Sequence, residues 1–433
     1  MTDKPTDDDI PLADGPDQLS PAHPPRESTG VKRAVALLGA ALLFGPWVAF
    51  AAGSRSDSVP GENRKLAPRP EIDGFKTFDE LTAYAADHFP LRDAAIRANE
   101  RLINGIFDEP PSYYGSAGRE QVLPGERGWL YFSDDFNKAC SPEIKLSKVI
   151  AGVRRLNTML AASGRRLVIT IPPDKSTADP QYLPKVFEQR ACADAAREAR
   201  YRALASLGVP GFVDMRANVQ KLEQEKGRQV FLPYDTHWDQ DAEAMFTTSV
   251  AEKLDPALST GTHIQAGQFY SESGDLEAIE GIRNKVHRFQ AVYVVRDGVK
   301  VTAAKPEELR PEKPGLYTIS RFTATSSSAP LFQPKTVWIG DSFTQRAMNG
   351  NKFQPFFRDV TRVPELTKGI LAGVQPQAKK RMIEEIVASK VVVIELVERT
   401  MFGAGSYGSM WDDAKQNRFL DDLQAALDKA PKQ

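Results

Sequence analysis

This chain of 433 residues lacks an excess of charge of either sign, because its 56 lysine and arginine residues are balanced by 57 aspartate and glutamate residues. Proteins that bind nucleic acid rely on basic residues that neutralise phosphates. The balanced composition therefore gives no reason to expect a nucleic-acid partner. Internal repeats are lacking as well, and the 41% share of hydrophobic residues is ordinary for a globular protein.

Charged side chains are absent from residues 34–52, directly after Lys32 and Arg33. As a helix, this run would be about 28 Å long, close to the hydrocarbon thickness of a bilayer. A helix in a protein core would instead carry a polar stripe, and the run has none. We therefore expect a transmembrane signal anchor at 34–52, preceded by a disordered cytoplasmic tail at 1–33 that is rich in aspartate and proline.

Cleavage of this anchor would follow Ala49-Phe50-Ala51, which resembles a signal-peptidase site. The polar region before the apolar run is unusually long for a cleaved signal peptide, so an uncleaved anchor is favoured. Basic residues flank both sides of the run, so their count does not decide its orientation. Because long domains cross a membrane largely regardless of charge, we expect a single-pass membrane protein whose carboxyl-terminal part is periplasmic or extracellular.

Cysteine is scarce, with only Cys140 and Cys192 in the whole chain. Outside the cytoplasm such a pair readily forms a disulfide. A bridge of this span stabilises a fold by roughly 4 kcal/mol if its effect comes from chain entropy. We predict this bridge, with two buried free thiols as the alternative.

Strand and helix patterns alternate across residues 121–433. The apolar runs at 167–171 and 390–396 are typical of strands that are buried on both faces. This pattern predicts an α/β domain with a mostly parallel sheet flanked by helices.

Two regions depart from this alternation. Residues 53–120 contain a polar linker and helical segments. At about 256–335 the alternation is lost, and Asp297-Gly298 predicts the turn of a β-hairpin. We expect this second region to be a β-rich insertion that decorates the sheet.

The stretch Thr336–Thr344 predicts a short buried strand, a tight turn at Gly340 and a helix that opens with Ser342. The serine hydroxyl would lie at the carboxyl edge of the sheet. There the backbone N–H groups of Ser342 and Phe343 could hold an oxyanion. Because Gly-Asp-Ser is more often only a turn, Ser342 is a candidate nucleophile only if a base lies beside it.

Asp235-Thr-His237 offers such a base. Residues two apart in an extended segment project from the same side, so Asp235 can bond to one imidazole nitrogen of His237 and fix its tautomer. The other nitrogen can then take a proton from a serine hydroxyl. Asp235, His237 and Ser342 therefore form a candidate catalytic triad.

Two other interpretations of this segment stay open. Asp235, His237, Asp239 and Asp241 mix carboxylate and imidazole ligands and could bind zinc or a hard cation. No further cluster completes a closed ligand set, so we favour a site without metal or cofactor. Alternatively, His237 and Trp238 only cap and pack the helix that follows.

Further side chains are expected to line the substrate cleft. Lys175 and Arg399 each follow a predicted strand at the same edge of the sheet, where open α/β sheets bind ligands. With Trp238 they are the candidate substrate-binding residues. Arg399 could instead form a structural ion pair with Glu395 or Glu398.

Five short motifs occur in order between about 75 and 405: Phe89-Pro-Leu-Arg-Asp93, Gly125-Glu-Arg-Gly-Trp-Leu-Tyr131, Asp235-Thr-His-Trp238, Gly340-Asp-Ser-Phe343 and Glu398-Arg399. This combination resembles the AlgX/AlgJ family of alginate O-acetyltransferase-like proteins, which have an SGNH-hydrolase-like domain. Each motif is short, so their order and spacing in one chain carry the resemblance.

The resemblance implies a periplasmic or surface enzyme that moves acetyl groups onto hydroxyls of an exopolysaccharide. It implies a permuted SGNH arrangement, in which Asp235 and His237 precede the nucleophile Ser342. It also implies a membrane-bound O-acyltransferase partner that supplies the acetyl group. The chain ends without room for a carbohydrate-binding module such as AlgX carries, so the AlgJ-like form is expected.

Two rival functions remain. An acetyl esterase has identical machinery with water as the acceptor, and nothing in the residues separates it from a transferase. A non-catalytic polysaccharide-binding scaffold would need no triad.

Overall fold

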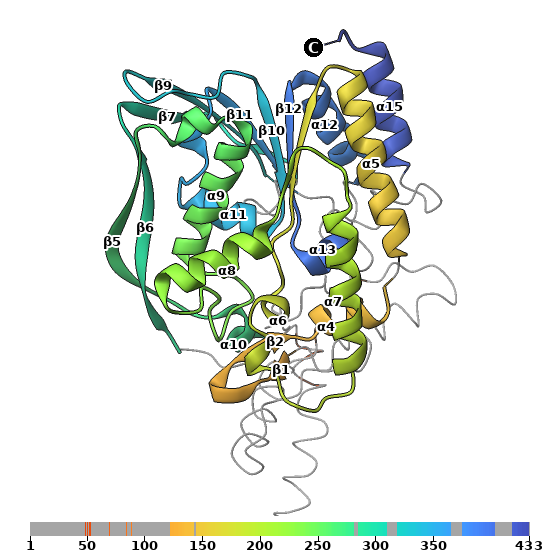
Figure 1. The fold of residues 1–433 in the computed structure, drawn as a ribbon, viewed down its shortest axis with the longest axis vertical. Helices are drawn as coiled ribbons and strands as arrows, with labels where there is room; N and C mark the ends of the chain where they lie inside the picture. The colour runs from red at the N-terminus through yellow and green to blue at the C-terminus, as the bar shows by residue number, and fades with distance from the viewer. Residues whose placement is uncertain are drawn as a thin grey trace, which may run out of the picture. The chain divides into compact units, whose positions relative to one another are not determined.

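An eight-stranded sheet is the centre of the part of the chain that the structure describes (Figure 1). The structure is a computed structural model, and it describes residues 122–142, 144–280, 285–309, 318–364, 375–402 and 418–432, with isolated positions before residue 122. Apart from those positions, the predicted tail, signal anchor and helical region lie outside the described residues. No described helix has the length and apolar character that crossing a membrane requires.

Five parallel strands form one side of the sheet in the order β4-β3-β12-β10-β11, and antiparallel strands extend it beyond β11. The parallel strands are β3 (Arg166–Thr170), β4 (Phe212–Val213), β10 (Thr336–Gly340), β11 (Asp359–Pro364) and β12 (Val391–Glu395). The antiparallel strands are β7 (Val299–Ala303), β8 (Glu307–Glu308) and β9 (Thr318–Ser326). The prediction of a mostly parallel sheet is confirmed.

Helices cover both faces of the sheet, because successive residues of each strand point to opposite sides. One face, with Ile339 and Ile394, packs against α5 (Leu146–Ala162), α12 (Gln375–Ala388) and α15 (Phe419–Lys429). The other, with Trp338 and Val393, packs against α8 (Met215–Lys226), α9 (Gln240–Leu254) and α11 (Ser342–Asn349). Shorter or peripheral helices are α4 (Asp134–Cys140), α6 (Lys175–Ala178), α7 (Arg190–Ala205), α10 (Asp275–Ile279) and α13 (Glu398–Phe402).

Two antiparallel pairs lie outside the main sheet: β1 (Val122–Pro124) with β2 (Leu130–Phe132), and β5 (Thr262–Glu272) with β6 (His287–Arg296). The β5–β6 ribbon stands beside α9 (Figure 1). The predicted hairpin around Asp297-Gly298 is wrong, because β6 pairs with β5 whereas β7 pairs with β9. The insertion therefore does more than decorate the sheet, since it supplies the antiparallel edge strands.

A disulfide joins Cys140, at the end of α4, to Cys192 in α7. The two cysteines are 52 positions apart in the chain. The bridge fixes the short helix α4, which carries little apolar surface of its own, to the longer helix α7.

We expect unreduced protein to contain no titratable thiol. Replacing both cysteines by serine should lower the free energy of unfolding by about 4 kcal/mol, because the unfolded chain regains the entropy of the open loop. Chemical denaturation measures the loss, with the exposed-site variant Ser206→Ala as the control. Two free thiols on unreduced protein would contradict the bridge.

Candidate active site

The turn after β10 is tightly packed around Gly340. A Cβ atom at this position would lie 2.0 Å from Thr344 Oγ1 and 2.8 Å from Glu395 Oε2. A larger residue therefore does not fit unless the turn moves. Ser342 follows as the first residue of α11 and is exposed to solvent at the carboxyl edge of the sheet.

Two buried carboxylates hold this turn. Glu395 Oε2, at the end of the neighbouring strand β12, accepts hydrogen bonds from Asp341 N and Thr344 N, both at 3.2 Å, and from Thr344 Oγ1 at 2.7 Å. Asp341 Oδ2 accepts a bond from Val397 N at 2.8 Å. Because these bonds tie the turn to the segment after β12, the serine stands on a rigid support.

Asp341 also caps α11, since its Oδ1 atom accepts a hydrogen bond from Phe343 N at 3.0 Å. The prediction that Phe343 N–H holds an oxyanion is therefore wrong. Ser342 N–H makes no hydrogen bond to any of the described residues. This one backbone donor is available to a negatively charged oxygen.

A closed loop at residues 230–239 carries the imidazole of His237. A backbone hydrogen bond of 2.7 Å from Asp239 N to the carbonyl of residue 230 closes its base. The ring of Trp238 is fully buried and packs edge-on against Phe343, with the two centroids 4.8 Å apart. This contact anchors the loop to α11.

The ammonium group of Lys175 holds the same loop from inside the protein. Its Nζ atom donates to the carbonyls of Leu232, Pro233 and Asp235 at 3.0, 3.1 and 2.7 Å. Burial lowers the pKa of Lys175 to about 8, although neighbouring aspartates oppose the shift. The prediction that Lys175 lines the cleft is wrong, because the side chain is 1% exposed and supports the loop instead.

Ser342, His237 and Asp235 form a continuous chain of hydrogen bonds. Ser342 Oγ lies 2.8 Å from His237 Nε2, and His237 Nδ1 lies 2.7 Å from Asp235 Oδ1. A carboxylate at Nδ1 favours the tautomer with the proton on that nitrogen, which leaves Nε2 able to accept the serine proton. The structure thus brings together the three residues that the sequence singled out.

A second carboxylate, Asp275, reaches the same imidazole. Asp275 Oδ2 lies 3.4 Å from His237 Nδ1, and Asp275 N donates to Asp235 Oδ2 at 3.1 Å. Thr236 donates to both oxygens of Asp275, from N at 2.7 Å and from Oγ1. Sequence reasoning missed Asp275, which begins α10 within the insertion.

The two carboxylates make His237 a stronger base than an ordinary histidine. Burial lowers the pKa of His237, but the hydrogen bonds and charges of Asp235 and Asp275 raise it more, to about 9. Burial raises the pKa of Asp235, but the hydrogen bond to His237 outweighs this effect, so the pKa of Asp235 lies well below its usual value. Asp235 therefore stays ionised over the physiological range.

The two other residues expected in the cleft are buried as well. Trp238 has no exposed surface, and Arg399 is 9% exposed. Arg399 Nη1 bonds to Asp174 Oδ1 at 2.8 Å and lies 3.6 Å from Asp135 Oδ1. The prediction that both residues line the cleft is wrong. Arg399 forms structural ion pairs, although with these aspartates rather than the two glutamates considered from the sequence.

The predicted metal alternative does not form, because Asp239 and Asp241 have other partners. Asp239 caps α9 and pairs with Arg228, and Asp241 pairs with Arg228 and Lys226. Their carboxylates are therefore committed to helix capping and to ion pairs.

A different trio, Asp235, His237 and Asp275, has ligand atoms within 4.8 Å of one another. Each of the four carboxylate oxygens already accepts a hydrogen bond from within the protein. A metal ion at this point would have to displace those bonds. The geometry therefore fits an imidazole held by two carboxylates better than a metal centre.

The family model described as "SGNH hydrolase-like domain, acetyltransferase AlgX" matches residues 122–363, more than half of the chain. The chain therefore belongs to this family, and the resemblance to AlgX/AlgJ-like proteins is confirmed. Its α/β fold with a mixed sheet is accordingly SGNH hydrolase-like.

Several curated and solved proteins are similar to this chain. The probable alginate O-acetylase AlgJ of Pseudomonas aeruginosa is 28% identical over 242 residues, 55% of this chain and 56% of that protein. The probable alginate O-acetylase AlgJ of Pseudomonas fluorescens is 28% identical over 195 residues, which are 45% of this chain and 46% of that protein. The chain thus spans about half the length of the curated relatives it matches. The structural match to the O-acetyltransferase domain of Pseudomonas putida AlgJ covers 70% of this chain and 99% of that domain, with 18% sequence identity and a TM-score of 0.45.

We expect the imidazole of His237 to titrate near pH 9. Asp275→Asn should lower this pKa by about one pH unit or more, because it removes one of the two negative charges that oppose the effect of burial. NMR of the imidazole carbons and nitrogens against pH measures the shift.

Asp297→Asn is the matched control, since Asp297 Oδ2 lies 3.2 Å from a different histidine, His263. This variant should leave the pKa of His237 unchanged. An unchanged pKa of His237 in Asp275→Asn would contradict the role given to the second carboxylate.

Proposed function

We propose that this protein is an O-acetyltransferase that acts on a cell-surface or secreted polysaccharide through an acetyl-Ser342 intermediate. The observation that carries the proposal is the chain of hydrogen bonds from Ser342 Oγ through His237 to Asp235. The description of the AlgJ relatives as probable alginate O-acetylases supports the choice of an acetyl group and a polysaccharide.

In the first step, Ser342 Oγ attacks the carbonyl carbon of an acetyl ester while His237 Nε2 takes the hydroxyl proton. Asp235 and Asp275 stabilise the imidazolium that forms, through its Nδ1–H group. The tetrahedral intermediate then collapses, the ester C–O bond of the donor breaks, and His237 returns the proton to the leaving oxygen. The products are acetyl-Ser342 and the alcohol of the donor.

In the second step, a sugar hydroxyl attacks the acetyl group on Ser342. His237 Nε2 takes the proton of this hydroxyl and gives it to Ser342 Oγ as the bond to the serine breaks. In both steps Ser342 N–H, which has no partner among the described residues, stabilises the negative oxygen of the tetrahedral intermediate.

An acetyl esterase is the second candidate, because Ser342 is exposed to solvent and water could take the place of the sugar. The transferase and the esterase share the first step and differ only in the acceptor. A non-catalytic polysaccharide-binding scaffold, the remaining alternative, would form no acetyl-serine.

The proposal includes a single-pass anchor at 34–52 and a periplasmic or extracellular catalytic domain. The disulfide between Cys140 and Cys192 supports an oxidising compartment. A membrane-bound O-acyltransferase as the acetyl supplier rests on the family resemblance alone.

Incubation of the full-length protein with p-nitrophenyl acetate should give an acetyl adduct on Ser342 that mass spectrometry locates. Ser342→Ala should abolish the adduct and lower donor hydrolysis by about a thousandfold, because the nucleophile is lost. Ser206→Ala, whose hydroxyl bonds to carbonyls of its own helix, is the control and should behave as wild type.

Added oligosaccharide should divert the acetyl group from water to sugar. Release of acetate with no acetylated sugar, across a range of oligosaccharides, would assign the esterase instead. Unchanged donor hydrolysis in Ser342→Ala would exclude both enzymes and leave the scaffold.

Dialysis against EDTA should leave donor hydrolysis unchanged, because the oxygens of Asp235 and Asp275 are engaged in hydrogen bonds rather than open to a metal. The activity is measured before and after dialysis and again with zinc added. A loss that zinc restores would contradict the triad and favour a metal centre.

A further inference from the structure

The segment that follows β12 lies between the two halves of the active site. In the sheet, β12 has β10 on one side and β3 on the other, and Glu395 at its end is aligned with Gly340 and with Thr170. The chain continues from β10 into the turn that carries Ser342, and from β3 toward α6. Residues 395–399 are therefore placed to contact both the serine turn and the start of α6.

The first part of this segment holds the serine half of the site. Glu395 accepts three hydrogen bonds from the turn, and Val397 N donates to Asp341 Oδ2 at 2.8 Å. Both carboxylates are buried, so water does not compete for these bonds. The position of the segment and the position of the serine turn are therefore tied to each other.

The second part, Glu398-Arg399, holds Asp174, the residue that precedes α6. Glu398 Oε2 accepts a hydrogen bond from Asp174 N at 3.3 Å, and Arg399 Nη1 donates to Asp174 Oδ1 at 2.8 Å. Two consecutive residues thus fix both the backbone and the carboxylate of Asp174. This motif is one of the five that carry the family resemblance, and the proposed reaction gives it no role.

The position of Asp174 in turn determines that of Lys175, the first residue of α6. The ammonium group of Lys175 donates to three carbonyls of the loop at 230–239, which carries His237. A displacement of Asp174 would therefore be passed to the loop and to the imidazole. An unbroken series of contacts leads from Arg399 to the histidine half of the site.

The guanidinium group of Arg399 stays charged although it is buried. Burial lowers the pKa of Arg399, but the charges of Asp174, Asp135 and Asp341 raise it more, so this pKa lies above its usual value. Without Arg399, the buried carboxylates of Asp174 and Asp135 would lose the cation that they share. A buried carboxylate that loses its cation is strongly destabilised, so Asp174 would move to other donors or take up a proton.

We propose that Arg399 is a positioning residue for the proposed reaction. Acting through Asp174 and Lys175, it keeps the loop at 230–239 where the imidazole of His237 meets the serine hydroxyl. Its own ion pairs are with Asp174 and Asp135 rather than with the reacting groups. The inference rests on the proposed reaction and adds the residue that couples its two halves.

Arg399→Gln tests this role through the rate at which phenylmethylsulfonyl fluoride modifies the full-length protein. In this modification Ser342 Oγ displaces fluoride from sulfur while His237 takes the hydroxyl proton. The rate reached above about pH 9 should fall by about tenfold or more, because a displacement of about 1 Å at a reacting group is enough for such a loss.

Two further properties of Arg399→Gln separate positioning from general damage. The pH at which the rate is half its maximum should stay as in wild type, because Asp235 and His237 belong to one loop and Asp275 is bonded to it. The adduct on Ser342 should still reach one per chain, because every folded molecule reacts, only more slowly.

Lys175→Met removes the ammonium group that joins α6 to the loop, and it should slow the modification as Arg399→Gln does. In the double variant the two effects should not multiply, because Arg399 acts through Lys175. Arg399→Lys should recover most of the rate. A single nitrogen, Nη1, makes both contacts with carboxylates, and a lysine ammonium group can replace it.

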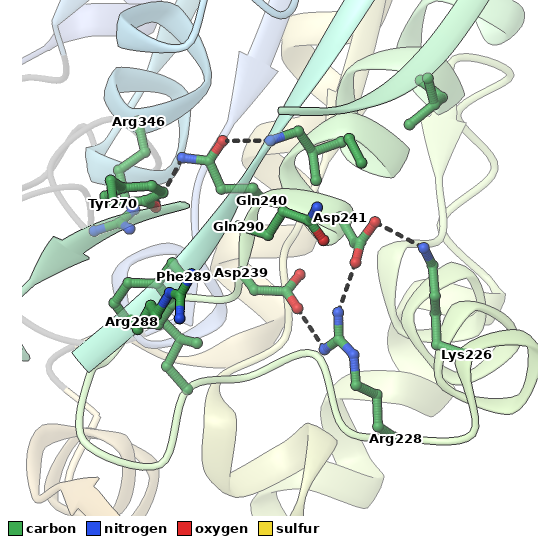
Figure 2. A pocket seen from close by; sticks show the side chains of 14 residues that line it. Lys226, Arg228, Asp239, Gln240, Asp241, Tyr270, Arg288, Phe289, Gln290 and Arg346 are labelled. Atoms are coloured by element: carbon green, nitrogen blue, oxygen red, sulfur yellow. Dashed lines mark hydrogen bonds and ion pairs between the residues drawn. The ribbon is translucent and has the colours of Figure 1, made fainter. Parts of the chain in front are cut away.

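Two other arginine variants are the controls. Arg228→Gln removes an exposed arginine that bonds to Asp239 and Asp241 beside the pocket between α9 and the β5–β6 ribbon (Figure 2). Exposed ion pairs of this kind contribute little to stability. Arg296→Gln removes a buried arginine that bonds to backbone carbonyls outside the site. In both controls Ser342 should be modified at the wild-type rate.

An unchanged rate in Arg399→Gln, effects that multiply in the double variant, or no recovery in Arg399→Lys would overturn the positioning role. An equal loss of rate in either control would overturn it as well. If Arg399→Gln does not fold, Asp174→Asn, which keeps the shape of the side chain, takes its place. Absence of the adduct in wild type refutes the proposed reaction, whereas a fast Arg399→Gln with an intact wild-type adduct refutes only the role of Arg399.

Discussion

The hydrogen bond between Ser342 Oγ and His237 Nε2 joins two segments that are 105 residues apart in the chain, and its 2.8 Å length depends on supports on both sides. On the serine side, Glu395 makes several bonds to the turn. On the histidine side, Lys175 binds three carbonyls of the loop. Burying a charged group costs free energy unless the group is hydrogen-bonded. The carboxylate of Glu395 and the ammonium group of Lys175 are therefore held in the positions where these bonds form. The reactive atoms are therefore aligned before any substrate arrives.

The electrostatics of the site carry both a benefit and a cost. Two carboxylates at one imidazole make His237 a stronger proton acceptor, but with a pKa of about 9 it is less often neutral near pH 7. One of these carboxylates, Asp275, comes from the insertion that also supplies the antiparallel edge strands of the main sheet. The insertion thus contributes to the basicity of the triad.

Much of the site could be predicted because its residues lie in short segments whose geometry depends on their neighbours in sequence. Asp275 could not be predicted, because it reaches His237 only when the β5–β6 ribbon packs against the loop at 230–239. Lys175 was misplaced because a position after a strand does not reveal whether a side chain points inward or toward the cleft. The bond from Phe343 N to Asp341 was predictable, because an aspartate before a helix normally caps it. The turn at 297–298 forms as predicted, but the hairpin was wrong, because the strands on its two sides pair with other strands and such pairing is decided over long range.

The claim that His237 activates Ser342 is tested most directly by the rate at which a sulfonyl fluoride modifies the protein at each pH. Only neutral His237 can take the serine proton, so the rate should rise with pH and level off above about pH 9. Mass spectrometry should place the adduct on Ser342, and His237→Gln should slow its formation by about a hundredfold or more. A rate that is the same in His237→Gln, or an adduct on another residue, would contradict the account.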